Sequence, residues 1–128
     1  TSLSPESPDS ALTDFLWPVV REIVKTCIEN GQNLIVEGCY IPFGWEKDFA
    51  DDYLPYIDYV CLILSEKYIR RNFENIIRHE NIIEKRQSTD VTIDNMIRIN
   101  NYNLGQCISR KYKHVLIDEY YRIDIGKI

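Results

Sequence analysis

The chain has 128 residues, of which 45% are hydrophobic and 27% are charged, as in an ordinary globular domain. Its net charge of −5 at pH 7 excludes a uniformly basic nucleic-acid binder, although it leaves room for a local basic face. No apolar stretch approaches the roughly 20 residues that span a bilayer, and no basic and then apolar leader opens the sequence. We therefore expect one cytoplasmic domain over residues 1–128, with neither nucleic acid nor a membrane as partner.

The first predicted element is a helix that begins at Ser10. Pro18 lies inside it, which predicts either a kink or a second helix with proline in its first turn. Asn30 and Gly31 predict its C-terminal cap. Apolar side chains recur along it at steps of three and four, at Leu12, Phe15, Leu16, Val19, Val20, Ile23, Val24, Cys27 and Ile28.

Residues 33–38, Asn-Leu-Ile-Val-Glu-Gly, form a short apolar run that ends in an acid and a glycine. A run of this length predicts a buried strand of a parallel sheet, and ligands gather at the carboxyl ends of such strands. Glu37 would stand at that end, where a carboxylate can hold a metal ion or a phosphate-bound water. The alternative is a strand that stops in a turn, with Glu37 only solvated.

Further elements follow in the second half of the chain. A short helix is expected over about 46–53, ended by Pro55. Residues 59–64 and 113–118 are apolar runs that predict two more strands, and the first of them has no polar interruption, which favours burial on both faces.

Two helices are expected between these strands. Ser65 is placed to cap the first, which carries Ile69, Phe73, Ile76 and Ile77 inward. The second runs over about 91–110, with one stripe formed by Ile93, Ile97, Asn101, Leu104 and Ile108. Strands that alternate with helices predict an α/β fold, a three-layer parallel sheet with flanking helices. Three strands are few for such a sheet, so we expect it to be incomplete at the N-terminus.

The order of these elements resembles the rear two-thirds of a small P-loop kinase, over about residues 10–119. The resemblance rests on the helix, Leu34-Ile35-Val36-Glu37-Gly38, the apolar strand, a Ser65-Glu-x-x-Ile-Arg-Arg helix, an arginine-bearing loop, a further helix and Val115-Leu-Ile-Asp. The adenylate-kinase-like, uridine-kinase-like and zeta-toxin-like phosphotransferases share this order. Their arginine-rich lid would correspond to about residues 70–90.

The resemblance implies roles for particular residues. Glu37 matches the Walker-B-like acid near Mg²⁺ and the attacking hydroxyl, and Gly38 would let the backbone pass close to bound phosphates. The resemblance places Arg70, Arg71 and either Arg78 or Arg86 where lid arginines neutralise the transferring phosphoryl group of ATP. The alternative for these arginines is a solvated helix face, with i,i+4 partners among Glu74, Glu80 and Glu84.

The family also suggests where the phosphoryl acceptor and the adenine would lie. Asp14, Trp17 and Arg21 share a helical face that would meet the acceptor, although a tryptophan there is more often a core residue. Tyr40 and Phe43 would wall the acceptor pocket, or else belong to a surface loop anchored by aromatic rings. Tyr120 follows the last strand, where this family often packs the adenine.

One departure from the family is severe, because no G-x-x-x-x-G-K-[ST] stands anywhere in the chain. The P-loop strand of the family lies centrally, so residues 33–38 and 59–64 lose their shared neighbour. We expect an ATP- and Mg²⁺-dependent kinase of nucleotides, nucleosides or sugars in the complete form, whose front 40 to 50 residues by family size are absent here. The chain alone would be inactive. The alternative is a non-catalytic relic that binds a partner or self-associates as a homodimer.

Overall fold

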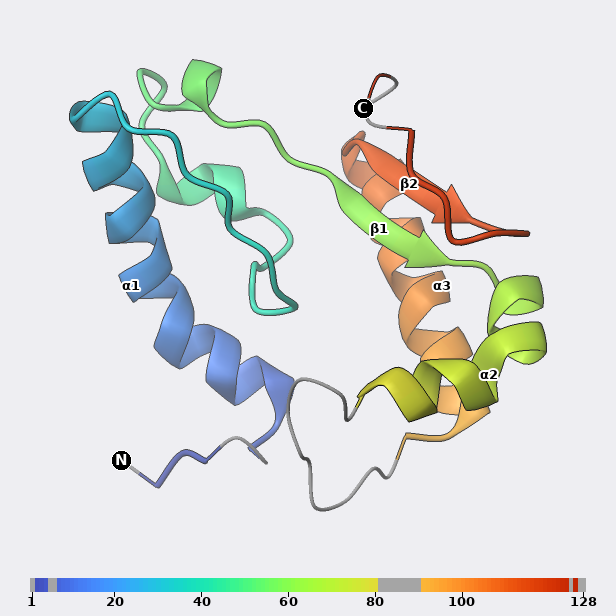
Figure 1. Ribbon diagram of the computed structural model, residues 1–128. Coiled ribbons are helices and arrows are strands. Elements are labelled where there is room, and N and C mark those ends of the chain that lie inside the picture. Colours follow the sequence, from blue (N-terminus) through green and yellow to red (C-terminus); the bar gives the residue numbers. More distant parts are fainter. Residues whose placement is uncertain (1, 5–6, 81–90, 125, 127–128) are drawn as a thin grey trace. The chain divides into compact units, whose positions relative to one another are not determined.

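The computed structural model describes residues 2–4, 7–80, 91–124 and 126 (Figure 1). These residues form two compact units, residues 1–58 and 59–128. The expectation of a single domain stays a prediction. The elements of the first unit are α1 (Asp9–Glu29) and the 3₁₀ helices η1 (Trp45–Asp48) and η2 (Leu54–Tyr56); those of the second are β1 (Cys61–Leu64), α2 (Glu66–Glu80), α3 (Ile93–Arg110) and β2 (His114–Ile117).

Helix α1 runs without interruption through Pro18, so the alternative of a second helix at this proline is wrong. Its C-terminal cap is confirmed. Gly31 has a φ of +63°, its N–H donates to the carbonyl of Ile28 at 3.2 Å, and the N–H of Gln32 donates to the carbonyl of Cys27 at 2.8 Å. This is the Schellman arrangement, which needs a residue that tolerates positive φ after the last turn.

An aromatic cluster holds the segment after residue 44 onto α1. Phe49 is buried, and its ring meets those of Trp17 and Trp45 edge-on at centroid distances of 6.1 and 6.0 Å. The indole N–H of Trp17 donates to the carboxylate of Asp48 at 2.7 Å. The expected helix over 46–53 is replaced by η1 and η2, with Pro55 in the first turn of η2.

The predicted strand over 33–38 is not formed. These residues have no helical or strand hydrogen bonding, and Ile35 is 94% exposed, with Leu34 and Val36 also exposed. A strand exists only with a hydrogen-bonded neighbour, and none of the described residues pairs with this segment. The prediction that Glu37 stands at the end of a buried strand is therefore wrong for this structure.

The second unit contains a two-stranded parallel sheet. β1 and β2 pair in a register that runs from Cys61 opposite His114 to Leu64 opposite Ile117. The N–H of Ser65 extends the ladder by donating to the carbonyl of Ile117 at 2.9 Å. The two predicted strands are confirmed, each shorter than its apolar run, and the three-layer sheet stays a prediction.

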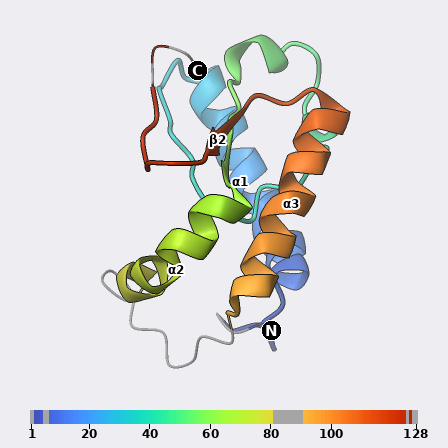
Figure 2. The ribbon, with the colours of Figure 1, turned by 90° about the vertical axis from the view of Figure 1, so that its right-hand side faces the viewer.

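Helix α2 follows β1 directly, and the predicted Ser65 cap is confirmed because its hydroxyl accepts from the N–H of Tyr68 at 3.0 Å. α3 is capped by Thr92, which directly precedes it and whose hydroxyl accepts from the N–H of Asn95 at 3.1 Å. It packs against both α2 and β1 (Figure 2). The chain leaves α3 through Lys111, which adopts a left-handed φ of +58°.

The core of the second unit is aliphatic and contains Ile63, Ile69, Ile97, Cys107 and Ile117. The predicted stripe on α3 is wrong at Asn101 and Ile108, which are both exposed. Cys107 and Asn100 lie inward instead. The side-chain oxygen of Asn100 accepts from the N–H of Leu64 at 2.8 Å and so ties α3 to β1.

Candidate functional site

The carboxyl ends of the parallel strands are the natural place to look for a ligand site in an α/β fold. In the second unit, the first turn of α2 follows β1, and β2 ends at Ile117, directly before Asp118. The ammonium of Lys67 in α2 pairs with the carboxylate of Glu119, which follows β2, at 3.1 Å. This edge therefore brings together a helix N-terminus, a lysine and two acids, Asp118 and Glu119.

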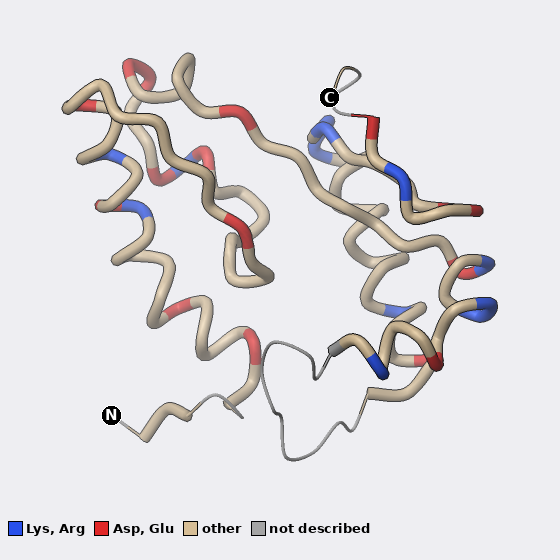
Figure 3. Tube along the Cα trace, in the orientation of Figure 1, with Lys and Arg blue, Asp and Glu red and all other residues tan. Residues whose placement is uncertain are grey.

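The basic residues of α2 are drawn in blue along its backbone in Figure 3, and the arginines among them differ in their ion-pair partners. Arg70 makes two hydrogen bonds to the carboxylate of Glu66, at 3.0 and 2.8 Å, and both side chains are about half exposed. Arg71 and Arg78 are exposed, and neither has an ion pair with another described residue. They are seven positions apart and hence share one face of the helix.

Among the described residues of α2, an i,i+4 ion pair forms at Arg70. Its acid is Glu66, one turn before it, and not one of the three glutamates considered above. An exposed pair of this kind contributes less than about 1 kcal/mol, so an incoming phosphate can displace Glu66 at small cost. The phosphate roles of Arg70, Arg71 and Arg78 stay predictions, and Arg86 lies outside the described residues.

Glu37 and Gly38 belong to the first unit, and both are exposed. Gly38 has a φ of +150°, which side chains rarely adopt, and a Cβ there would meet no atom within 4 Å. The glycine is therefore required by backbone conformation and not by crowding. No group of three or more potential metal ligands exists within the described ranges, so these residues do not by themselves fit a Mg²⁺ site.

The residues proposed to bind the phosphoryl acceptor differ in how far they are buried. The indole of Trp17 is buried in the aromatic cluster, Asp14 is exposed, and the guanidinium of Arg21 pairs with Glu22 at 3.2 Å. Tyr40 and Phe43 are half-buried in the loop before η1. Binding of an acceptor by these five residues stays a prediction.

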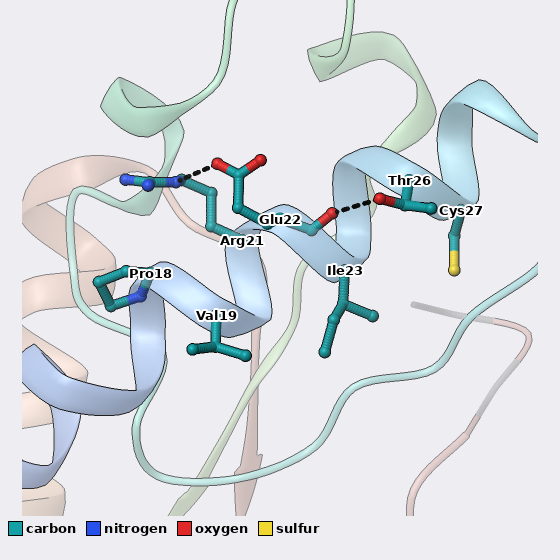
Figure 4. A pocket seen from close by; sticks show the side chains of 7 residues that line it. All are labelled: Pro18, Val19, Arg21, Glu22, Ile23, Thr26 and Cys27. Atoms are coloured by element: carbon teal, nitrogen blue, oxygen red, sulfur yellow. Dashed lines mark hydrogen bonds and ion pairs between the residues drawn. The ribbon is translucent and has the colours of Figure 1, made fainter.

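An open groove of about 560 Å³ runs along α1 on the side of Arg21 (Figure 4). Its lining is mostly apolar, and Glu22 is its acid, held by Arg21 and by Lys25 at 3.5 Å. The helix thus presents a second apolar side in addition to the one that holds Phe49. The groove is lined by Pro18, Val19, Arg21, Glu22, Ile23, Thr26 and Cys27.

Tyr120 is 78% exposed beyond β2, and its role toward an adenine stays a prediction. A thiol cluster lies at the other end of this sheet, where the thiol of Cys61 lies beside that of Cys107. Burial, with the Cys61 thiol beside it, raises the pKa of Cys107 to about 12. Burial raises the pKa of Tyr59 as well, with Cys61 as a further cause. A thiol held neutral in this way is a packing group and a poor nucleophile.

Sequence reasoning missed three polar residues that organise the structure. Asn100 bonds the backbone of β1, Asp48 accepts from the buried Trp17, and Glu119 pairs with Lys67. Only Glu119 had a signal, because acids just after a predicted parallel strand lie at its carboxyl end. The other two depend on contacts between residues more than 30 positions apart.

None of the helices in the described part of the chain combines the length and the apolar character that a membrane crossing requires. Comparison with known proteins gave no match to a protein family, to a curated protein or to a solved structure.

Proposed function

We propose that this chain is the rear part of an ATP-dependent phosphotransferase that acts on a small-molecule acceptor, a nucleotide, nucleoside or sugar. The 128 residues alone carry no phosphate-binding loop, so they are inactive on their own. Phosphoryl transfer depends on positioning and on charge neutralisation, and the P-loop supplies the backbone amides and the lysine for both.

One observation carries the proposal. Two parallel strands are joined by a connection with a helix at each end, and the first of these helices carries exposed arginines. This arrangement is compatible with the rear of the kinase resemblance, in which lid arginines lie between the last two strands. Arg71 and Arg78 are exposed on α2 and are accessible to an anion.

The same resemblance assigns Glu37 to the metal and to the acceptor hydroxyl, but the described residues place it in no group of three or more potential metal ligands. In a complete kinase, bound MgATP would supply the phosphoryl group and the metal would spread its charge. The described residues would contribute arginine side chains for that charge. No step through the metal follows from the present arrangement.

The test is to read the codons upstream of Thr1 and to express the complete protein. We expect a strand followed by G-x-x-x-x-G-K-[ST], and ADP formation that requires an acceptor from a panel of nucleotides, nucleosides and sugars. Arg71→Ala and Arg78→Ala should each lower kcat at least tenfold, by loss of transition-state charge stabilisation. Arg110→Ala on α3 is the matched control and should leave kcat unchanged, because Arg110 is a surface residue of α3 that donates to Gln106 at 3.0 Å. The absence of an upstream P-loop would overturn the proposal.

A second function, self-association without catalysis, is favoured by the unpaired segment 33–37. Its apolar side chains are exposed and its backbone has no strand partner among the described residues. Exposed extended backbone of this kind is a template for pairing with another chain.

A further inference from the structure

Residues 33–37 are neither helix nor strand, and their backbone groups make no hydrogen bond to another described residue. Gly31 and Gly38, both with positive φ, delimit it at its two ends. Its central side chain, Ile35, is 94% exposed, and its neighbours Leu34 and Val36 are 45% and 37% exposed. A free backbone edge and apolar side chains are the two requirements for adding a β-strand.

The sequence of the segment is self-complementary in one orientation only. In an antiparallel pair centred on Ile35, Leu34 faces Val36 of the second copy, and Asn33 faces Glu37 of the second copy. Each Asn33 amide can then donate to a carboxylate across the pair, and this happens twice because of the twofold axis. A parallel, in-register pair would instead oppose Glu37 to Glu37, and like charges directly opposite are destabilising.

We propose that residues 33–37 of two copies of this 128-residue chain pair as antiparallel strands about a twofold axis at Ile35. The inference deepens the self-association function and does not rest on the kinase function. The two are tested separately, because strand pairing needs neither nucleotide nor acceptor. Five-residue strands bury far less area than the roughly 1,200–2,000 Å² of a stable interface, so the dimer is weak and concentration-dependent.

Sedimentation measured from micromolar to millimolar protein tests the association. The native chain should shift from monomer to dimer as its concentration rises. Ile35→Lys should weaken the dimer at least tenfold, because two lysines would face each other at the axis. Ile108→Lys makes the same change at another exposed isoleucine, in α3, and should leave the dimer intact.

Mixing two charge variants shows whether the dimer is lost through charge repulsion at the axis or through misfolding of the variant. Ile35→Lys and Ile35→Glu should each be monomeric alone and should form a heterodimer together, since opposite charges then meet at the axis. Restoration by mixing supports the proposal. A native chain that stays monomeric up to millimolar concentration overturns it, as does a mixture that fails to associate.

Disulfide formation under mild oxidation then tests the register, in a Cys39→Ser background because Cys39 is exposed. Ile35→Cys should cross-link to itself, since the Cα atoms of directly opposed residues in an antiparallel pair lie about 4.5 or 5.5 Å apart, within disulfide range. Asn33→Cys and Glu37→Cys should not link to themselves but should link to each other when mixed. Self-linking of Asn33→Cys would overturn the antiparallel register, and the background protein alone should give no cross-link.

Discussion

Two apolar runs of similar length, one in each unit, have different fates. In the second unit, Cys61–Leu64 is a strand with a parallel neighbour, and Ile63 within it is 1% exposed. In the first unit, residues 33–37 are unpaired with any described residue, and Ile35 is 94% exposed. Sequence composition alone does not separate them. The difference is whether another segment of the described chain supplies hydrogen bonds and cover.

The cores of the two units also differ in how much of the surrounding chain covers them. The first unit is held by edge-on aromatic contacts around Phe49 and by single polar bonds to α1. The second buries aliphatic side chains between a paired sheet and α3. A paired sheet offers a continuous surface for packing, whereas isolated aromatic contacts fix a loop at a few points. Substitutions can measure how far this contrast extends.

The largest effect is expected at Ile69, which is fully buried in α2. Ile69→Ala should lower the unfolding free energy of the second unit by about 2–5 kcal/mol, through lost transfer energy and the cavity left behind. Urea unfolding followed by hydrogen exchange of the α3 amides measures this loss. A loss below about 1 kcal/mol would show that the aliphatic core is poorly packed.

The next effect is a pH dependence of the second unit. The pKa of Cys107 is raised from 9.0 to about 12 in the fold, chiefly by burial, so above pH 9 the unfolded chain loses this proton first. The contribution of the protonated Cys107 thiol to stability is therefore fully present below about pH 9 and is lost as the pH rises toward 12. Tyr59, whose pKa is also raised, acts in the same direction.

Urea midpoints at pH 7, 9 and 10.5 should therefore fall with pH. Cys107→Ala should be less stable at pH 7 but should show a shallower fall. An equally steep fall in Cys107→Ala would assign the pH dependence to other groups.

A smaller effect is expected in the first unit at Asp48, which is exposed but accepts from the buried Trp17. Asp48→Ala leaves that indole N–H without its partner and should cost about 1–2 kcal/mol. Asp48→Asn keeps an acceptor and should cost less. Both tryptophans of the chain lie in this unit, so their fluorescence during urea unfolding is the readout.

The smallest effect is expected at Ile35. Ile35→Ala should change the stability of the dilute, monomeric chain by less than about 0.5 kcal/mol, because the side chain is exposed. Ile35→Ala thus removes an exposed isoleucine of the first unit, whereas Ile69→Ala removes a buried isoleucine of the second unit. A loss of more than 1 kcal/mol in dilute solution would mean that Ile35 is covered within a single copy.

Local signals in the sequence predicted local structure well. The Gly31 cap, the Ser65 cap and the two paired strands were predicted because each depends on neighbouring residues or on a long apolar run. The predicted inward stripe of α3 was displaced by one position, because Asn100 lies inward in place of Asn101. Asn100 bonds the backbone of Leu64, and no periodicity in the sequence reveals that contact. The strand over 33–38 failed for the same reason, because its partner is not encoded locally.

The candidate site was less predictable than the fold. Arg70, Arg71 and Arg78 were placed on a helix correctly, but their exposure and the Glu66 pair depend on three-dimensional packing. The position of Glu37 was inferred from a sheet that the described residues do not complete. Residue types and their spacing therefore suggested the chemistry of the site. The contacts that would fix the geometry of these side chains would have to come from elsewhere in the chain or from a partner.

The register of the sheet has a kinetic consequence. Each pair of the ladder, from Cys61 and His114 onward, joins residues 53 positions apart. Closing so long a loop costs entropy before any ladder bond forms, whereas α2 and α3 need only local contacts. During refolding, helical circular dichroism should therefore recover before protection of the β1 and β2 amides. Until that last step, both strand edges of the second unit are open to other chains, so rapid dilution at low concentration should favour recovery of the native fold.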